Sequence, residues 1–200
     1  MMEIFISTFL KMFFIMTPFF VLSVFLTVTH DATIKERKKL AIKVTTSVIV
    51  VSLVLLFFGN HIFDVFGITL DAFRIGAGAL MFLSAVELIQ GNKATAKVGD
   101  KDILDLAVVP LAIPITIGPG TIGILLVMGA TFENKSSMVM GSLALICAVL
   151  VIGIMLYSSN IIEKIIGKQG LLVISKITGL FLAALSAQIV FTGIKNFLGL

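Results

Sequence analysis

Charged residues are scarce in this 200-residue chain, at 13%, whereas apolar residues make up 58%. A soluble domain carries about 25% charged residues, so the composition excludes an ordinary soluble protein and indicates one that crosses a lipid bilayer several times. The mean hydropathy of +1.17 agrees with this class. The net charge of +4 does not indicate nucleic-acid binding, because the basic residues fall in the connections between apolar segments.

Cysteine and histidine are almost absent. The single cysteine, Cys147, lies in an apolar stretch, which excludes a disulfide framework. The two histidines, His30 and His61, stand alone in the chain, whereas a zinc site needs several clustered ligands. The enzyme motifs H-E-x-x-H and G-x-S-x-G are also missing. We therefore expect no metal site, no cofactor and no enzymatic activity.

Long apolar segments dominate what is present. A membrane-spanning helix needs about 20 predominantly apolar residues. Six segments meet this length: 4–29, 40–58, 71–90, 105–131, 138–157 and 173–197. The connections between them are short, so we predict one transmembrane domain over residues 1–200. The first segment opens with Glu3 instead of a basic residue and is too long for a signal peptide, so we count it as a span.

Lysine and arginine are distributed unevenly between the two sides that six spans would define. Eleven of the 15 basic residues lie in or beside the first, third and fifth connections. Because basic residues favour the cytoplasmic side, we expect these connections inside the cell, both termini outside, and a location in the cytoplasmic membrane. The larger group is Lys35, Arg37, Lys38, Lys39, Lys43, Lys93, Lys97, Lys101, Lys164, Lys168 and Lys176; the smaller is Lys11, Arg74, Lys135 and Lys195.

The two halves of the chain resemble each other. Residues 74–91 and 176–193 coincide at six positions when the chain is shifted by 102, and a shift of 101 superimposes Pro18 on Pro119. The first repeat covers about residues 1–98 and the second about 103–200. Each half would hold three spans, so the second half must be inserted upside down. We predict an all-α membrane protein of six helices in two inverted three-helix repeats, an organisation found in many secondary transporters.

Three of the four prolines fall in the fourth apolar segment. The stretch PLAIPITIGPGTIG (110–123) combines them with three glycines, and neither residue type suits a continuous helix. Pro18 interrupts the first segment. At about 1.5 Å per residue, Pro18 and Gly118 lie roughly 20 Å from opposite faces of a hydrocarbon core about 30 Å thick. We predict that the first and fourth helices are broken near the midplane, with simple proline kinks as the alternative.

A broken membrane helix survives only where protein or a cavity satisfies its backbone groups. We expect Pro119 to free the Ile115 carbonyl and Pro18 that of Phe14, while the amides after Gly118 favour an anion. Such donors and acceptors suit a small dipolar solute. The predicted substrate-binding residues are Thr17, Pro18, Ser23, Thr116, Gly118, Pro119, Gly120 and Thr121, together with Gln188, for which hydrogen bonding between helices is an equal alternative.

Ionisable residues inside spans are rare and are functional candidates first. Glu87, near the cytoplasmic end of the third helix, is the best candidate for a proton carrier. Lys11 is expected to extend its side chain towards the membrane surface, with a place on a vestibule wall as the alternative. Arg74 follows Asp71 by one turn, so we expect a local ion pair.

The stretch PLAIPITIGPGTI (110–122) resembles the fourth-helix signature of the MarC family of six-span bacterial and archaeal membrane proteins. FRIGAGALMFL (73–83) and ITGLFLAALSAQIVFTGIKNFL (177–198) resemble the third and sixth helices of that family, so the similarity covers nearly the whole chain. The resemblance implies a relation to the lysine-exporter superfamily. It also implies a substrate among small neutral amino acids such as glycine and alanine, which some members transport.

The first helix departs from the family pattern, which is approximately D-P-x-G-N-x-P-x-F. Thr17 replaces the acidic or amide residue, Phe20 the glycine, Val21 the asparagine and Ser23 the second proline. The membrane carboxylate of the pattern is therefore absent, which bears on the substrate and on proton coupling at this position.

These observations predict a secondary transporter of a small polar solute, whose partners are that solute and the lipid bilayer, with no nucleic acid. A channel, and a non-transporting scaffold or regulatory protein derived from a transporter fold, are the alternatives. The small-residue rows Ala72/Gly76 and Gly179/Ala183/Ala187 are expected to be helix-packing faces. A chain of 21.5 kDa with such faces is suited to forming a homo-oligomer.

Overall fold

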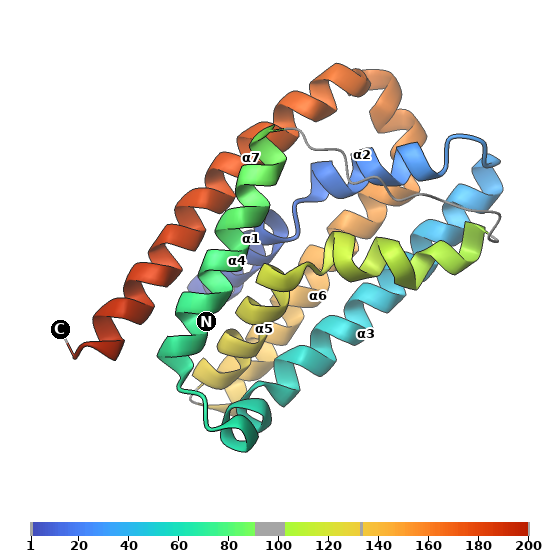
Figure 1. Cartoon of the computed structure of the whole chain (residues 1–200). Helices are drawn as coiled ribbons and strands as arrows, with labels where there is room; N and C mark the ends of the chain where they lie inside the picture. The colour runs from blue at the N-terminus through green and yellow to red at the C-terminus, as the bar shows by residue number, and fades with distance from the viewer. Residues whose placement is uncertain (1, 91–102, 133, 200) are drawn as a thin grey trace.

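The structure is a computed structural model that describes residues 2–90, 103–132 and 134–199. In these ranges the chain is helical, and most helices run between two ends of an elongated bundle (Figure 1). The elements are α1 (Met2–Ile15), α2 (Pro18–Val28), α3 (Ile34–Phe66), α4 (Leu70–Gln90), η1 (Ile103–Ala107), η2 (Val108–Thr116), α5 (Pro119–Thr131), α6 (Lys135–Tyr157) and α7 (Ser159–Phe197). The expected basic residues Lys93, Lys97 and Lys101 and the boundary between the repeats lie outside the described residues.

Four described helices are long and apolar enough to cross a membrane, namely α3 (over Ile34–Phe58), α4, α6 and α7. Two bent pairs also qualify if each pair counts as one span. The axes of α1 and α2 differ by 40°, and those of the segment Leu104–Thr116 and α5 differ by 74°. The described residues therefore contain four to six candidate spans, and both bends fall at the prolines that predicted them.

The bend between α1 and α2 is made by a left-handed residue followed by a proline. Thr17 has φ 47° and ψ 60°, and Pro18 opens α2, where the first turn requires no N–H donor. The Thr17 amide donates to the Phe14 carbonyl at 3.0 Å, and the Val21 amide donates to the Thr17 carbonyl at 3.0 Å. The expectation that Pro18 leaves the Phe14 carbonyl free is wrong, because the Thr17 turn supplies the missing donor.

The second bend follows an irregular segment formed by the proline-rich stretch. Within η2, Val109 (φ −126°, ψ 118°) and Ile113 (φ −130°, ψ 125°) are extended, and each directly precedes a proline, which disfavours helical backbone. The Ile113–Pro114 peptide bond is cis. Helix α5 then begins at Pro119 after Gly118, whose backbone is extended.

Helix α3 is longer at both ends than its apolar segment predicts. A capping box starts it at Ile34: the Glu36 amide donates to Thr33 Oγ1 at 3.3 Å, and the Thr33 amide donates to Glu36 Oε2 at 2.8 Å. At its other end α3 continues to Phe66 and stops at Gly67, which has φ 62°. Hydropathy alone cannot detect such polar helix ends.

Helix α7 also includes residues that were expected to form a connection. It begins at Ser159 and bends at Gly167, where φ is 69° and ψ is 165°. Glycine adopts such a positive φ without steric penalty. The fifth predicted connection is therefore a short helical arm that joins the long spanning part of α7 through this bend.

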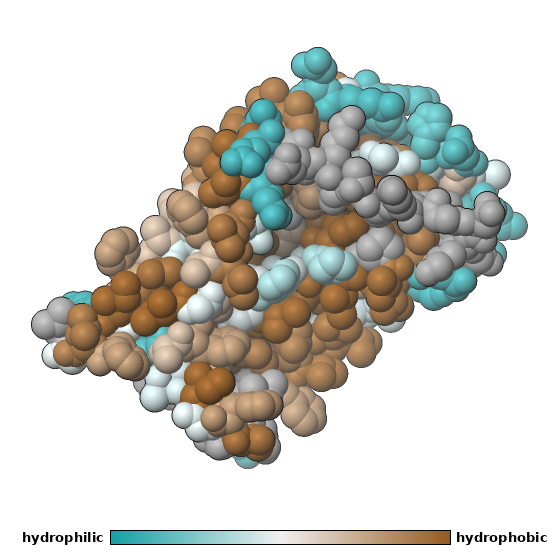
Figure 2. All heavy atoms as spheres, in the orientation of Figure 1, coloured by the Kyte–Doolittle hydropathy of each residue, from teal (hydrophilic) through white to brown (hydrophobic). Residues whose placement is uncertain are grey.

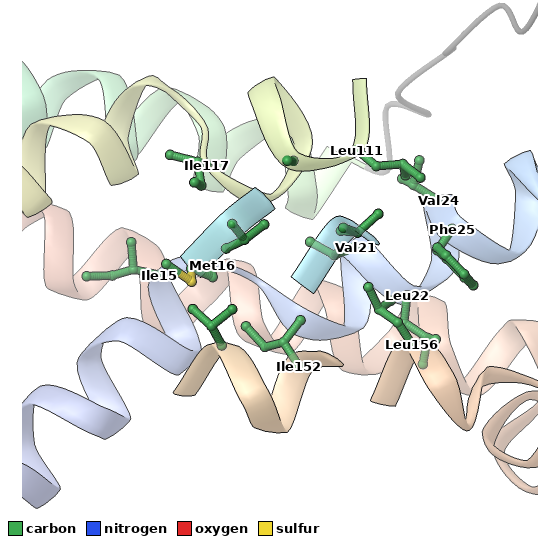
Figure 3. Packing of buried hydrophobic residues seen from close by; sticks show 14 of the residues in the cluster. Ile15, Met16, Val21, Leu22, Val24, Phe25, Leu111, Ile117, Ile152 and Leu156 are labelled. Atoms are coloured by element: carbon green, nitrogen blue, oxygen red, sulfur yellow. The ribbon is translucent and has the colours of Figure 1, made fainter. Parts of the chain in front are cut away.

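The two bends share one apolar core. Figure 3 shows Ile15 and Met16 from the end of α1, Ile117 from just before α5, and Ile152 and Leu156 from α6 in the same cluster. All five are at most 5% exposed. Packing of this kind covers the backbone where the two helices bend, as a non-helical segment inside a membrane requires, whereas Val109 near the start of η2 is 65% exposed.

Both chain termini lie at the same end of the bundle (Figure 1). We call this the terminal end; it also holds the α3–α4 turn and the α5–α6 connection. The opposite end holds the α2–α3 turn and the bend of α7, and we call it the basic end. Its lysines and arginines include Lys35, Arg37, Lys38, Lys39, Lys164 and Lys168. Figure 2 shows hydrophilic residues gathered there and a largely apolar surface along the sides.

Candidate functional site

A cavity of about 410 Å³ lies where the two bends meet α4 and α7. We call it the central cavity. It is lined by Ile15, Thr17, Phe20, Met81, Ser84, Glu87, Leu88, Pro114, Ile115, Thr116, Gly118, Pro119, Gly120, Thr121 and Leu182. Its volume falls within the range of small-molecule sites, about 300–1,000 Å³. The wall is mostly apolar, with a few polar groups that converge from the bends and from α4.

The structure brings together six of the nine predicted substrate-binding residues. Those on the central cavity are Thr17, Thr116, Gly118, Pro119, Gly120 and Thr121, and Glu87 joins them. Pro18 is buried and Ser23 is half-buried, but neither belongs to the cavity wall. Gln188 lies elsewhere, on the wall of a second cavity. The two helix breaks therefore do meet at one cavity, whereas the sixth-helix amide does not.

The start of α5 presents backbone donors to the central cavity. Helical hydrogen bonding begins at Ile122, whose amide donates to the Gly118 carbonyl at 3.0 Å. The preceding amides, of Gly120 and Thr121, have no acceptor within the helix. They also lie at the positive end of the helix dipole. This part of the wall favours a negatively charged group such as a carboxylate.

Glu87 supplies the opposite charge. Among the described residues that line the central cavity it is the only ionisable one, and its side chain is exposed. Glu87 lies on the last turn of α4, towards the basic end. The cavity therefore combines a carboxylate on one side with the amides of a helix start on another, an arrangement that suits a solute with separated positive and negative groups.

The threonine hydroxyls of the cavity differ in what they bind. Thr116 Oγ1 donates to the Leu111 carbonyl at 2.8 Å, so it stabilises the wide turn of η2. The Thr17 side chain makes no capping hydrogen bond to α2. A hydroxyl that already donates can still accept a hydrogen bond from a solute. Thr17 and Thr116 therefore both offer polar contacts on the mostly apolar wall of the central cavity.

The two glycines that flank Pro119 have different surroundings. A Cβ on Gly118 would meet only the Pro114 carbonyl oxygen, at an ordinary contact of 3.4 Å. A Cβ on Gly120 would lie 2.8 Å from the Met81 Cα. Gly118 therefore leaves space for a ligand next to the cavity, whereas Gly120 is required for the close packing of α5 against α4.

Comparison with known proteins identifies the family. A family model described as "MarC family integral membrane protein" matches residues 2–198. The chain belongs to the MarC family. A UPF0056 membrane protein of Aquifex aeolicus is 31% identical over 98% of this chain and 94% of its own length. One from Methanocaldococcus jannaschii is 30% identical over 98% of both chains, and one from Buchnera aphidicola is 30% identical over 96% and 93%. No solved structure matches the chain.

Two residues at which the first helix departs from the expected family pattern, Phe20 and Val21, lie beside the first bend. Phe20 stands on the wall of the central cavity, where its ring occupies space. Val21 is fully buried in the apolar core beside the bend (Figure 3). Neither side chain offers a polar group. The polar groups that the first bend contributes to the central cavity are therefore those of Thr17 and the backbone.

A second cavity of about 360 Å³ lies nearer the terminal end of the MarC chain. We call it the terminal cavity. Its polar lining consists of Thr8, Lys11, Arg74, Thr131, Gln188 and Thr192. The structure therefore places Lys11 on a cavity wall, which corresponds to the alternative considered for this residue. The expected ion pair is confirmed: Arg74 Nη1 lies 2.7 Å from Asp71 Oδ1.

Sequence reasoning did not name eight residues of the central cavity wall as site residues, namely Ile15, Phe20, Met81, Ser84, Leu88, Pro114, Ile115 and Leu182. Ser84 lies on α4 one turn before Glu87, so the two share a helix face, and this spacing could have revealed it. Met81 and Leu182 give no such signal, because an apolar residue in a membrane helix looks the same whether it faces lipid or a cavity. Within the described ranges, no three His, Cys, Asp or Glu side chains come close enough to hold a metal ion.

Proposed function

We propose that this MarC-family protein is a secondary transporter of a small dipolar solute, with small neutral amino acids as the substrate class. One observation carries the proposal, namely the polarity of the central cavity. A substrate carboxylate would bind the amides of Gly120 and Thr121, and a substrate ammonium would lie towards the Glu87 carboxylate. Because Phe20 and Met81 line the same cavity, a substrate with a small side chain fits best.

The proposal includes two inverted repeats that move against each other to alternate access. The helix packing supports this arrangement. A shift of 101 residues places α1 on η1 and η2, and α2 on α5. Exchange of the two halves therefore converts the contact of α1 with α6 into those of η1 and η2 with α3, and the contact of α4 with α5 into that of α7 with α2; all of these contacts are present. The contacts of α4 with α7 and of α3 with α6 convert into themselves, and both are present.

The interface between α4 and α7 supports the repeats at the level of single residues. Each helix has a glycine against which the other helix packs. The contacts are those of Gly78 with Ser186 and Val190, and of Gly179 with Ala85 and Ile89. A shift of 101 residues converts the first set into the second. This is the shift that superimposes Pro18 on Pro119, so the bends and the interface obey one relation.

The proposal also covers orientation. Lysine and arginine at the basic end favour the cytoplasmic side, which puts both termini outside and makes the cytoplasmic membrane the location. The central cavity would then face the cytoplasm, with Glu87 as the candidate proton carrier at its entrance. No cofactor, nucleic acid or enzymatic step is part of the proposal.

Counterflow in proteoliposomes tests the transport function. Purified protein would be reconstituted with an internal load of unlabelled glycine or alanine, and uptake of the labelled amino acid would be measured. We expect saturable counterflow for the wild type. Gly118→Leu should abolish it, because the new side chain extends into the cavity, whereas Gly118→Ala should keep it, because a Cβ has space there. The backbone at Gly118 is extended, with φ −76° and ψ 172°, so both side chains are compatible with it.

Three results would separate the proposal from its alternatives. Flux without saturation or counterflow would indicate a channel. No flux of either amino acid from folded wild-type protein would contradict the substrate class and favour the scaffold. Equal counterflow in wild type and Gly118→Leu would move the site away from the central cavity. Counterflow by wild type and Glu87→Gln, measured at several imposed pH gradients, tests proton coupling. We expect wild-type transport to respond to the gradient and transport by Glu87→Gln not to respond.

A further inference from the structure

The central and terminal cavities are framed by the same four elements. Residues of α1, α4, α5 and α7 line both of them. Ile15, the last residue of α1, lines both cavities and is 5% exposed. A residue that belongs to two cavity walls lies between the cavities, so Ile15 separates them.

The order of residues along each helix places the two cavities at different depths. On α5, Thr121 lines the central cavity and Ile124 the terminal one. On α7, Leu182 lines the central cavity and Leu185 the terminal one. Three helical residues correspond to a rise of about 4.5 Å. On these two helices the partition between the cavities is therefore only about one helical turn thick.

Apolar side chains make up this partition. Met81, Ile124 and Leu182 are each less than 10% exposed and surround the level of Ile15. On α4, Arg74 lines the terminal cavity and Met81 the central one, so the partition lies between them. Figure 3 shows Ile15 between the bends, at the end of α1. The side chains of Ile15, Met81, Ile124 and Leu182 are all apolar, so among these described residues no ion pair would need to be broken to open the layer.

We infer that the two cavities are the vestibules of a single solute path, closed in this conformation by an apolar gate formed by Ile15 and Leu182. The inference rests on the proposed transport function and adds a second vestibule and a gate to it. The central cavity is the vestibule of the basic end, and the terminal cavity is that of the terminal end. Because Ile15 directly precedes the bend at Thr17, a change of angle between α1 and α2 moves the gate.

The terminal vestibule is suited to a solute that carries a carboxylate. Lys11 lines it, and in the part of the chain that the structure describes its ammonium group makes no ion pair. Arg74 is neutralised by Asp71, which also accepts a hydrogen bond from Asn196 Nδ2 at 3.3 Å. Gln188 and Thr192 add groups that donate and accept. The one uncompensated charge of this wall is therefore positive.

Thiol labelling tests the two vestibules without any need to know the substrate. In a Cys147→Ala background, Gln188→Cys and Ser84→Cys place one thiol in each cavity. A charged, membrane-impermeant methanethiosulfonate reagent would be applied to one face of proteoliposomes at a time. We expect Gln188→Cys to react faster from the face of the terminal end, and Ser84→Cys faster from the face of the basic end. Leu143→Cys, on an α6 position that is 48% exposed on the outside of the bundle, should react from neither.

Gate variants then test the partition. Ile15→Ala should raise the rate at which Ser84→Cys reacts from the terminal face by tenfold or more, and leave the rate at Gln188→Cys unchanged. Leu182→Ala should act in the same direction and provides a second variant if Ile15→Ala does not fold. Leu145→Ala removes an equally buried side chain of α6 that lines neither cavity, and should change neither rate.

The outcomes separate this inference from the transport proposal. A path and gate without amino-acid counterflow would uphold the inference and reject the substrate class. Counterflow with no effect of either gate variant on Ser84→Cys would uphold transport and overturn the gate. Reaction of Gln188→Cys only from the basic face would overturn the assignment of the terminal cavity as a separate vestibule.

Discussion

Thr17 has a backbone conformation that its side chain disfavours. Its φ of 47° places it in the left-handed region, where β-branched residues are outliers and asparagine is several-fold enriched. The turn nevertheless persists, because the Thr17 amide donates a hydrogen bond to the Phe14 carbonyl. The same residue sets the direction in which α2 begins. Strain at this residue is thus part of the geometry of the first bend.

Thr17→Asn should therefore stabilise the protein. A non-glycine residue in the left-handed region costs of the order of 1–3 kcal/mol, and asparagine relieves part of this, so we expect a gain of about 1 kcal/mol in the free energy of unfolding. Thr17→Val keeps the branched Cβ and should give no gain. Thermal unfolding in detergent micelles compares the two variants. Equal midpoints for Thr17→Asn and wild type would mean that no strain is stored there.

Ser52 is a second residue whose local chemistry has a consequence for stability. It is fully buried in α3, and its hydroxyl has no hydrogen-bond partner among the described atoms. Burial of an unpaired hydroxyl is unfavourable by about 1–3 kcal/mol.

Ser52→Ala should accordingly leave the free energy of unfolding unchanged or raise it. The matched control is Ser175→Ala, because Ser175 is also buried in a helix but its hydroxyl donates to the Leu171 carbonyl at 2.8 Å. We expect the control to lose about 1 kcal/mol. Denaturant unfolding of both variants measures the difference, and a larger loss at Ser52 than at Ser175 would show that the Ser52 hydroxyl is bonded in the membrane.

At the scale of elements, the sequence predicted the helices well where hydropathy and proline determine them. The bends at Pro18 and Pro119 lie where the prolines indicated. Hydropathy could not show that α3 extends beyond its apolar part, because it does not register the capping box at Thr33 or the terminal Gly67. Both are local sequence signals of a helix start and a helix end, and they could have extended the prediction. The sequence also could not show whether a glycine near a break leaves space for a ligand or for a closely packed neighbouring helix.

The packing of α5 against α4 depends on such a glycine. Gly120→Ala should lower the free energy of unfolding by about 1–3 kcal/mol, the usual penalty for overpacking, because the new Cβ collides with the backbone at Met81. Gly76→Ala on α4 is the control. No described atom lies within 4 Å of its added Cβ, so the packing face expected at Gly76 has no partner helix among the described residues. Helix propensity should therefore make this variant stabilising by about 0.5–1 kcal/mol. If both variants behaved alike, Gly120 would have no packing role.

At the scale of the whole molecule, the sequence predicted which polar residues could form a site but not how they divide. Thr17 and Thr121 meet in the central cavity because both adjoin helix breaks, which the sequence marks. Gln188 and Lys11 belong to the terminal cavity, and their grouping depends on the depth and rotation of α1 and α7 in the bundle. Hydropathy determines neither quantity in a helix that is apolar on every side.

The proposed repeat relation makes a prediction that belongs to the molecule as a whole. If α4 and α7 are equivalent, Gly78→Ala and Gly179→Ala create equivalent close contacts, since their added Cβ atoms would meet Val190 Cγ2 at 2.7 Å and Ile89 Cγ1 at 3.0 Å. Each variant should lower the free energy of unfolding by a similar amount, about 1–3 kcal/mol. The double variant should lose less than the sum, by about 0.5 kcal/mol or more, because the separation of the helices that accommodates one Cβ also makes room for the other. Unfolding of the two single variants and the double variant in the same detergent measures this coupling. A large loss at one glycine and none at the other would show that the two halves do not share the α4–α7 interface equally, and would count against the proposed inverted repeat at this interface.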